Sequence, residues 1–166
     1  MVEKKVVVDA VRFTYSGMLD VQDLFKEVDE WAEHNGDERE TKKKLQHVEE
    51  NGKKLDYIYE LWKELERDAR SVVRLRILIK DLVDFTLERE SHIRNMQKGH
   101  LLVIIDGFVE TDLSHRWSNK PWYVFLRTIV DKIFWRYWIA RYDGYVTTAS
   151  FDLFNRLHRF IKKYKY

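Results

Sequence analysis

Four polar residues that follow an apolar segment have the types and spacing that acid/base or metal chemistry requires. Asp106, Glu110 and Asp112 share one parity in a predicted strand, and His115 follows shortly after them. Because alternate residues of a strand face the same side, these carboxylates are expected to line one edge of a sheet. Carboxylates act as general bases or as cation ligands. The competing interpretation is that the strand leaves the core here and becomes polar.

No other recognised catalytic signature is present in the sequence. It has no Gly-rich phosphate loop, no GxSxG, no HExxH and no EF-hand pattern, and its six His are scattered without ligand spacing. The absence of Cys excludes disulfides, thiolate metal sites and thiol nucleophiles, and it favours a reducing compartment. We therefore predict a cytoplasmic protein that is not an enzyme and needs no cofactor.

The segment 121–142 has the composition of a contact surface. Fifteen of its 22 residues are apolar or aromatic, and eight of them are Trp, Tyr or Phe. A helix that covers a sheet with one face needs only about three apolar positions in seven, so several side chains are in excess. Aromatic residues and Arg are enriched at interface hot spots. The predicted interaction surface comprises Trp122, Phe125, Phe134, Trp135, Arg136, Trp138 and Arg141.

Three alternatives remain for this segment. A second C-terminal helix would bury the excess side chains, a membrane surface would bind a basic amphipathic helix with Trp, and RNA would stack on aromatics. Charge bears on the choice: residues 117–166 carry 10 Lys and Arg against 3 Asp and Glu, whereas the rest carries 20 against 25. Such asymmetry indicates either two parts or two subunits that attract each other, or a surface for nucleic acid or acidic lipid.

The first half of the chain predicts a strand, a helix and a hairpin. β-Branched and aromatic residues over 5–15 indicate a strand, and a helical stripe then runs to about His34 and ends at Asn35-Gly36. Asn51-Gly52 predicts a hairpin in which His47 faces Asp56 and five charged pairs lie opposite one another. Residues 53–69 also fit a helical face, so strand and helix both remain open for them. The stripe comprises Val21, Leu24, Phe25, Val28, Trp31 and Ala32.

The second half predicts further strands and then helix. Residues 71–80 alternate as a strand that continues to Leu87, a short strand is expected within 88–97, and 101–109 is the most apolar strand and the expected centre of the sheet. Helices are predicted over 121–142 and 145–163, with Asp143-Gly144 between them as a kink or a break.

These elements together predict one α+β domain over 1–166. It has an antiparallel sheet of five or six strands and one N-terminal helix after the first strand. One long kinked or two consecutive C-terminal helices pack on the sheet. The longest strongly apolar run, Leu101–Ile105, is far shorter than the ~20 residues that span a bilayer. No apolar segment follows the charged N-terminus. We therefore expect neither a transmembrane helix nor a signal peptide.

Two stretches resemble small archaeal α+β proteins of unknown function: GMLDVQDLFKEVDEWAEHNG (17–36) and NKPWYVFLRTIVDKIFWRYWIARY (119–142). The predicted element order is also similar to helix-grip folds, which wrap a sheet around a terminal helix, although a second helix before the sheet is lacking. The leading hypothesis is an interaction protein that self-associates through its aromatic and basic C-terminal helices. The alternatives are a binder of an apolar small molecule, which the helix-grip resemblance implies, and an RNA- or ribosome-associated protein.

Overall fold

The structure is a computed structural model of the 166-residue chain. It describes residues 3–66, 69–89, 92–111 and 135–165, together with four residues between 122 and 129. Residues 3, 87–89, 92–94 and 135–139 are described by their backbone alone. Three residues of the predicted interaction surface and acidic site, Phe134, Asp112 and His115, lie outside the described part of the chain.

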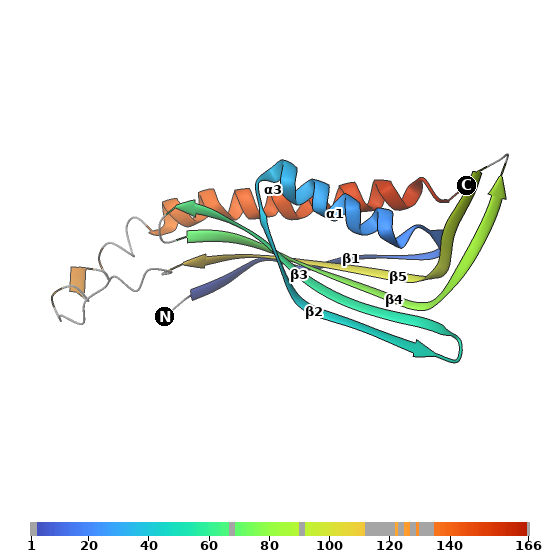
Figure 1. The fold of residues 1–166 in the computed structure, drawn as a ribbon. Helices are drawn as coiled ribbons and strands as arrows, with labels where there is room; N and C mark the ends of the chain where they lie inside the picture. Colours follow the sequence, from blue (N-terminus) through green and yellow to red (C-terminus); the bar gives the residue numbers. More distant parts are fainter. Residues whose placement is uncertain are drawn as a thin grey trace.

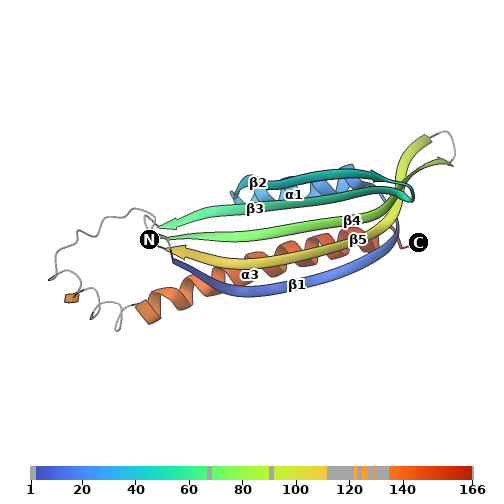
Figure 2. The ribbon, with the colours of Figure 1, turned by 90° about the horizontal axis from the view of Figure 1, so that it is seen from below.

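Five antiparallel strands and two helices make up the described fold. Both helices lie on the same face of the sheet and leave the other face uncovered (Figures 1 and 2). The strand order is β1-β5-β4-β3-β2, so the first and last strands are neighbours. The elements are β1 (Glu3–Leu19), α1 (Val21–Asn35), β2 (Glu38–Glu49), β3 (Gly52–Glu66), β4 (Ala69–Arg89), β5 (His92–Thr111) and α3 (Trp135–Lys162).

The α+β class, the antiparallel sheet, the helix after the first strand and the C-terminal helix are therefore confirmed. Residues 53–66 are a strand, which decides between the two interpretations of that segment. The apolar strand 101–109 lies within β5, but β4 rather than β5 is the middle strand of the five. None of the described helices is long and apolar enough to cross a membrane.

Helix α1 follows from its local sequence. The Asp20 side chain caps the N-terminus by accepting hydrogen bonds from the backbone N–H groups of Gln22 and Asp23. At the other end Gly36 adopts the left-handed conformation, with φ of 71°, that closes a helix. The predicted apolar stripe faces the sheet and the other helix, and all of its members except the half-buried Phe25 are fully buried.

The core lies between the helices and the inner face of the sheet, which is the face toward α1 and α3. Helix α3 lies close to β5 at Gly107, where a Cβ would lie 2.5 Å from Ser150 Oγ and 2.8 Å from Val146 Cγ1. Only glycine permits this approach. The side chains of α3 and the inner strands that lose all contact with water include Val146, Leu153, Leu157, Leu61, Val73, Leu75, Ile77, Ile79, Val103 and Ile105.

The β2–β3 hairpin forms as predicted, but its register was predicted wrongly by two residues. Glu50 and Asn51 form the turn, so Glu49 lies opposite Gly52 and His47 lies opposite Lys54 rather than Asp56. A bulge between Thr41 and Lys43 shifts the remaining pairs further. Between the turn and the bulge, a slip of two residues keeps each side chain on its original face, so the apolar pattern does not distinguish the two registers.

Helix α3 continues through Asp143 and Gly144, where a kink or break was predicted. The helix is uninterrupted from Trp135 to Lys162, and a Cβ at Gly144 would meet nothing within 4 Å. A glycine inside a helix costs only about 1 kcal/mol. Burial of Tyr142 and Val146, on either side of Gly144, offsets that cost.

Candidate functional site

An exposed apolar helical face is the first candidate site. Trp122, Phe125, Leu126 and Ile129 are helical, and 67%, 60%, 40% and 43% of these side chains, in that order, are exposed. Their spacing of i, i+3, i+4 and i+7 places them on one side of a helix. The rings of Trp122 and Phe125 lie 6.2 Å apart between centroids. We call these four residues the aromatic face.

Two of the seven residues predicted as an interaction surface, Trp122 and Phe125, belong to the aromatic face. Trp135, Arg136 and Trp138 lie in the first turns of α3, and only their backbone is described. Arg141 is exposed on α3. Leu126 and Ile129, which are not among those seven residues, are exposed alongside the two aromatics.

Some basic residues of the C-terminal part form ion pairs with acidic residues of the same chain. Arg156 of α3 pairs with two carboxylates of α1, Glu27 at 2.8 Å and Glu30 at 3.2 Å. The indole N–H of Trp31 donates to Asp152 Oδ2 at 2.7 Å and ties the same two helices together. The expected attraction between the basic C-terminal part and the acidic remainder therefore acts between α1 and α3.

The uncovered outer face of the sheet carries three buried carboxylates, each held between two cations. Their side chains are only 1–11% exposed, whereas those of the six cations are 32–52% exposed. In every triplet the Arg comes from the middle strand β4 and the Lys from an edge strand. The triplets are Lys4–Glu110–Arg70, Lys42–Glu60–Arg74 and Lys43–Asp56–Arg76.

These contacts control the ionisation of the three acids. Burial alone would raise the pKa of Glu110, Glu60 and Asp56. Hydrogen bonds from the flanking Arg and Lys outweigh burial, so the pKa of each carboxyl lies below its ordinary value. Each of the three carboxylates is therefore ionised and fully engaged at neutral pH.

Two of the four residues of the predicted acidic site, Asp106 and Glu110, lie in the described part of the chain. Asp106 and Glu110 are both on β5, where Asp106 Oδ1 accepts a hydrogen bond from the backbone N–H of Ala10 at 2.8 Å. Ala10 has a φ of 46° and lies where the β1–β5 register shifts, so Asp106 stabilises an irregularity of β1. Glu110 belongs to one of the ion triplets. Both carboxylates thus have structural partners.

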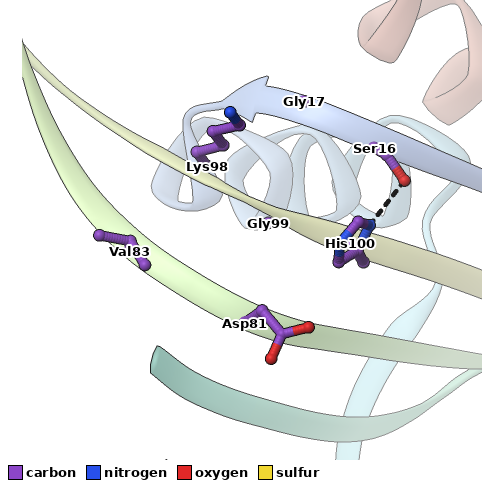
Figure 3. Close-up of a pocket in the computed structure, with 7 residues that line it drawn as sticks. All are labelled: Ser16, Gly17, Asp81, Val83, Lys98, Gly99 and His100. Atoms are coloured by element: carbon purple, nitrogen blue, oxygen red, sulfur yellow. Dashed lines mark hydrogen bonds between the residues drawn. The ribbon is translucent and has the colours of Figure 1, made fainter. Parts of the chain in front are cut away.

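A pocket of about 340 Å³ on β1, β4 and β5 is the second candidate site. Its residues on β4 flank Leu82, which lies opposite Lys53 near the start of β3. Beyond this level the β4–β5 hairpin extends past the other strands (Figure 1). Figure 3 shows the residues that line it: Ser16, Gly17, Asp81, Val83, Lys98, Gly99 and His100.

Sheet register brings the polar groups of this pocket together. Ser16 lies opposite His100, and its Oγ is 2.7 Å from His100 Nδ1 (Figure 3). Asp81 projects from an irregularity of β4 between Lys80 and Val83, where its own φ is 53°. The sequence prediction missed this pocket, because its residues come from three strands and no local motif joins them.

The comparisons with known proteins add no family. The sequence matches no family model, and no curated protein resembles it at a significant level. Within the described part of the chain, no three His, Cys, Asp or Glu side chains are placed to hold a metal ion.

Proposed function

We propose that this chain is a non-enzymatic interaction protein that associates with a second copy of itself through the aromatic face. The observation that supports this proposal is the exposure of Trp122, Phe125, Leu126 and Ile129 on one side of a helix. Exposed apolar patches of this kind on a folded chain are typical of contact surfaces.

The core provides the second argument, because it is complete without these four side chains. Helix α3 buries its own stripe, which includes Val146, Leu153 and Leu157, against the sheet. Helix α1 lies on the same face of the sheet and contacts α3 (Figure 1). Burial of the aromatic face therefore requires a surface beyond the described sheet and helices, and a second copy offers the same face for a symmetric contact.

The composition around the aromatic face is also that of a protein contact. Trp and Phe, here Trp122 and Phe125, carry large contact areas at low entropic cost, and aromatic residues are enriched at interface centres. The surplus of 5 acidic charges outside residues 117–166 supplies a complementary surface for the basic segment of a second copy.

The test is the solution mass measured by size-exclusion chromatography with light scattering. We expect the wild type to have a mass that is a multiple of 20.3 kDa. Trp122→Ser combined with Phe125→Ser should shift it to the monomer mass while the circular dichroism spectrum and the thermal unfolding of the fold stay unchanged. Trp135→Ala with Trp138→Ala probes the neighbouring part of the predicted surface in the same assay.

Phe151→Ser is the matched control, because Phe151 is an aromatic of α3 that is 42% exposed but lies outside the aromatic face. It should leave the mass unchanged. A wild type that is monomeric at every concentration would overturn the proposal. Unfolding of the Trp122/Phe125 variant would also do so, because these side chains would then belong to the core. Binding of the monomer to anionic vesicles through the same residues would assign the face to a membrane surface instead.

A further inference from the structure

The two edge strands of the sheet differ in charge. The strand order makes β1 and β2 the edges, and each presents backbone N–H and C=O groups that no described strand pairs. Seven of the 12 residues of β2 are charged, and such charges protect an edge against pairing with another chain. Between Val11 and Leu19 of β1, by contrast, Arg12 is the one charged residue. We call residues Val11–Leu19 the open edge.

The backbone of the open edge is regular. It pairs with β5 in one continuous register, and the irregularities of β1 lie earlier, between Val6 and Val11. In Figure 2 this half of β1 forms the margin of the sheet. A regular edge strand with few charges is a template to which an extended segment of another chain can add as a further strand.

Aromatic side chains of α3 lie beside the open edge. Phe13 of β1 contacts Phe154 and His158 of α3, with 5.4 Å between ring centroids in both cases. Phe151 precedes Phe154 by three residues and His158 by seven, so it lies on the same flank of the helix. Its side chain is 42% exposed, and Phe13 and Phe154 are only partly buried. Apolar side chains of an added strand would therefore be buried against these rings.

The charges next to the open edge are positive. Arg12 of β1 and Lys162 of α3 are exposed, and Lys162 follows His158 by four residues, which places it on the same flank of the helix. The open edge contains no Asp or Glu. The one acid of α3 between residues 151 and 162 is Asp152, which accepts a hydrogen bond from Trp31 on the side of α1. An acidic segment is therefore favoured over a basic one.

We propose that the open edge binds an extended segment of another protein by strand addition, and that apolar and acidic residues alternate in this segment. Successive side chains of a strand point to opposite faces. The apolar side chains of the segment lie against Phe13 and Phe151, and its acidic side chains lie on the outer face beside Arg12. This surface is separate from the aromatic face, so the inference is independent of the proposed self-association.

The probe is the peptide Val-Glu-Val-Thr-Val-Glu-Val, amidated at its C-terminus and labelled with fluorescein at its N-terminus. Fluorescence anisotropy measures its binding to the full-length protein, and we expect saturable binding. Hydrogen–deuterium exchange locates the peptide: the amides of the open edge should become protected, whereas those of β2 should not.

Two altered peptides test the mode of binding. Neighbouring residues of a strand donate their N–H groups to opposite sides, so Pro in place of both Thr and the following Val removes a hydrogen bond to β1 in any register. This peptide should bind at least about tenfold more weakly. Lys in place of both Glu residues should also weaken binding about tenfold, because a basic peptide is repelled by Arg12.

Variants of the protein assign the contacts. Phe151→Ser removes an exposed ring and should weaken the peptide about fivefold. Arg12→Gln should weaken it by a similar factor, while a peptide with Gln in place of both Glu residues keeps its affinity. Lys44→Gln removes an exposed cation of the other edge strand and is the matched control. Trp122→Ser with Phe125→Ser should bind the peptide like the wild type, which separates this site from the aromatic face.

Three results would overturn the inference. The first is the absence of saturable binding, and the second is equal affinity for the original peptide and the peptide with two Pro. The third is normal binding by Phe151→Ser and Arg12→Gln, whose folding is checked by circular dichroism. Protection of the open edge that rises with protein concentration in the absence of peptide would assign this edge to a second copy and would also overturn it.

Discussion

The two faces of the sheet are stabilised by different interactions. On the inner face, α1 and α3 cover aliphatic side chains that have no contact with water, such as Ile77 and Ile105. No described element covers the outer face (Figure 2). On that face Glu110, Glu60 and Asp56 are each held by a pair of half-exposed cations. Apolar burial supplies the driving force on one face, and paired charges keep the other face hydrated and ordered.

The ion pairs of the outer face account for part of the high charge content of the sequence. Charged residues make up 35% of the chain, but this fraction alone does not indicate that the protein binds a polyanion or a polycation. Many of the charged side chains form ion pairs with residues of neighbouring strands.

The largest expected difference between the two faces comes from a matched pair of truncations. Leu153→Ala removes a fully buried side chain of α3, and we expect a loss of about 2–5 kcal/mol in the free energy of unfolding. Leu102→Ala removes a partly exposed side chain of β5 on the outer face, and it should cost less than about 1 kcal/mol. Urea unfolding measures both. Equal losses would show that the outer face is covered in solution.

An intermediate effect is expected from the ion triplets. Glu110→Gln leaves Lys4 and Arg70 beside a neutral side chain and should cost about 1–3 kcal/mol at pH 7. Because the pKa of Glu110 is lower in the folded state, its stabilisation is present above the ordinary pKa of Glu. This stabilisation is lost as pH falls through the folded value.

The urea midpoint at pH 7 and pH 3 therefore separates the wild type from this variant. Wild type should lose more stability than Glu110→Gln over this interval. Glu38→Gln, an exposed acid of β2, serves as the control and should follow the wild type. Identical pH dependence in all three proteins would mean that the Glu110 triplet contributes nothing to folding.

The smallest effect is expected at Asp37, which directly follows the cap of α1. Burial raises the pKa of Asp37 to about 6, although Lys63 and Asn35 act to lower it. A folded pKa above the unfolded value gives stability that is complete below pH ~4 and is lost as pH rises through 6. With allowance for partial exposure, the loss is on the order of 1 kcal/mol.

Asp37→Asn should therefore be more stable than wild type at pH 8 and similar to it at pH 4, as judged by thermal unfolding. Asp9→Asn changes an exposed carboxylate of β1 and should leave the pH profile as it is. An Asp37→Asn profile that falls between pH 5 and pH 7 as steeply as that of wild type would assign the titration to another group.

Local sequence patterns predicted helices and strands well where a single residue fixes the backbone conformation at the end of an element. Asp20 and Gly36 mark the two ends of α1, and alternation in 71–80 and 101–105 is matched by burial on the inner face. The same reasoning failed at Gly144, where local propensity favours a break. There, tertiary burial of Tyr142 and Val146 keeps the helix continuous.

The α+β class, the helix α1 with its stripe and the hairpin near Asn51 could all be predicted from the sequence. Each of these depends on neighbours within a few turns or a few residues of a strand. The hairpin register, the ion triplets and the contact between Ser16 and His100 could not be predicted and are seen only in the folded chain. Each of these contacts joins residues of different strands, and Ser16 and His100 are also distant in the chain. Their pairing follows from how strands align, and slips that preserve each side chain's face leave no trace in the apolar pattern.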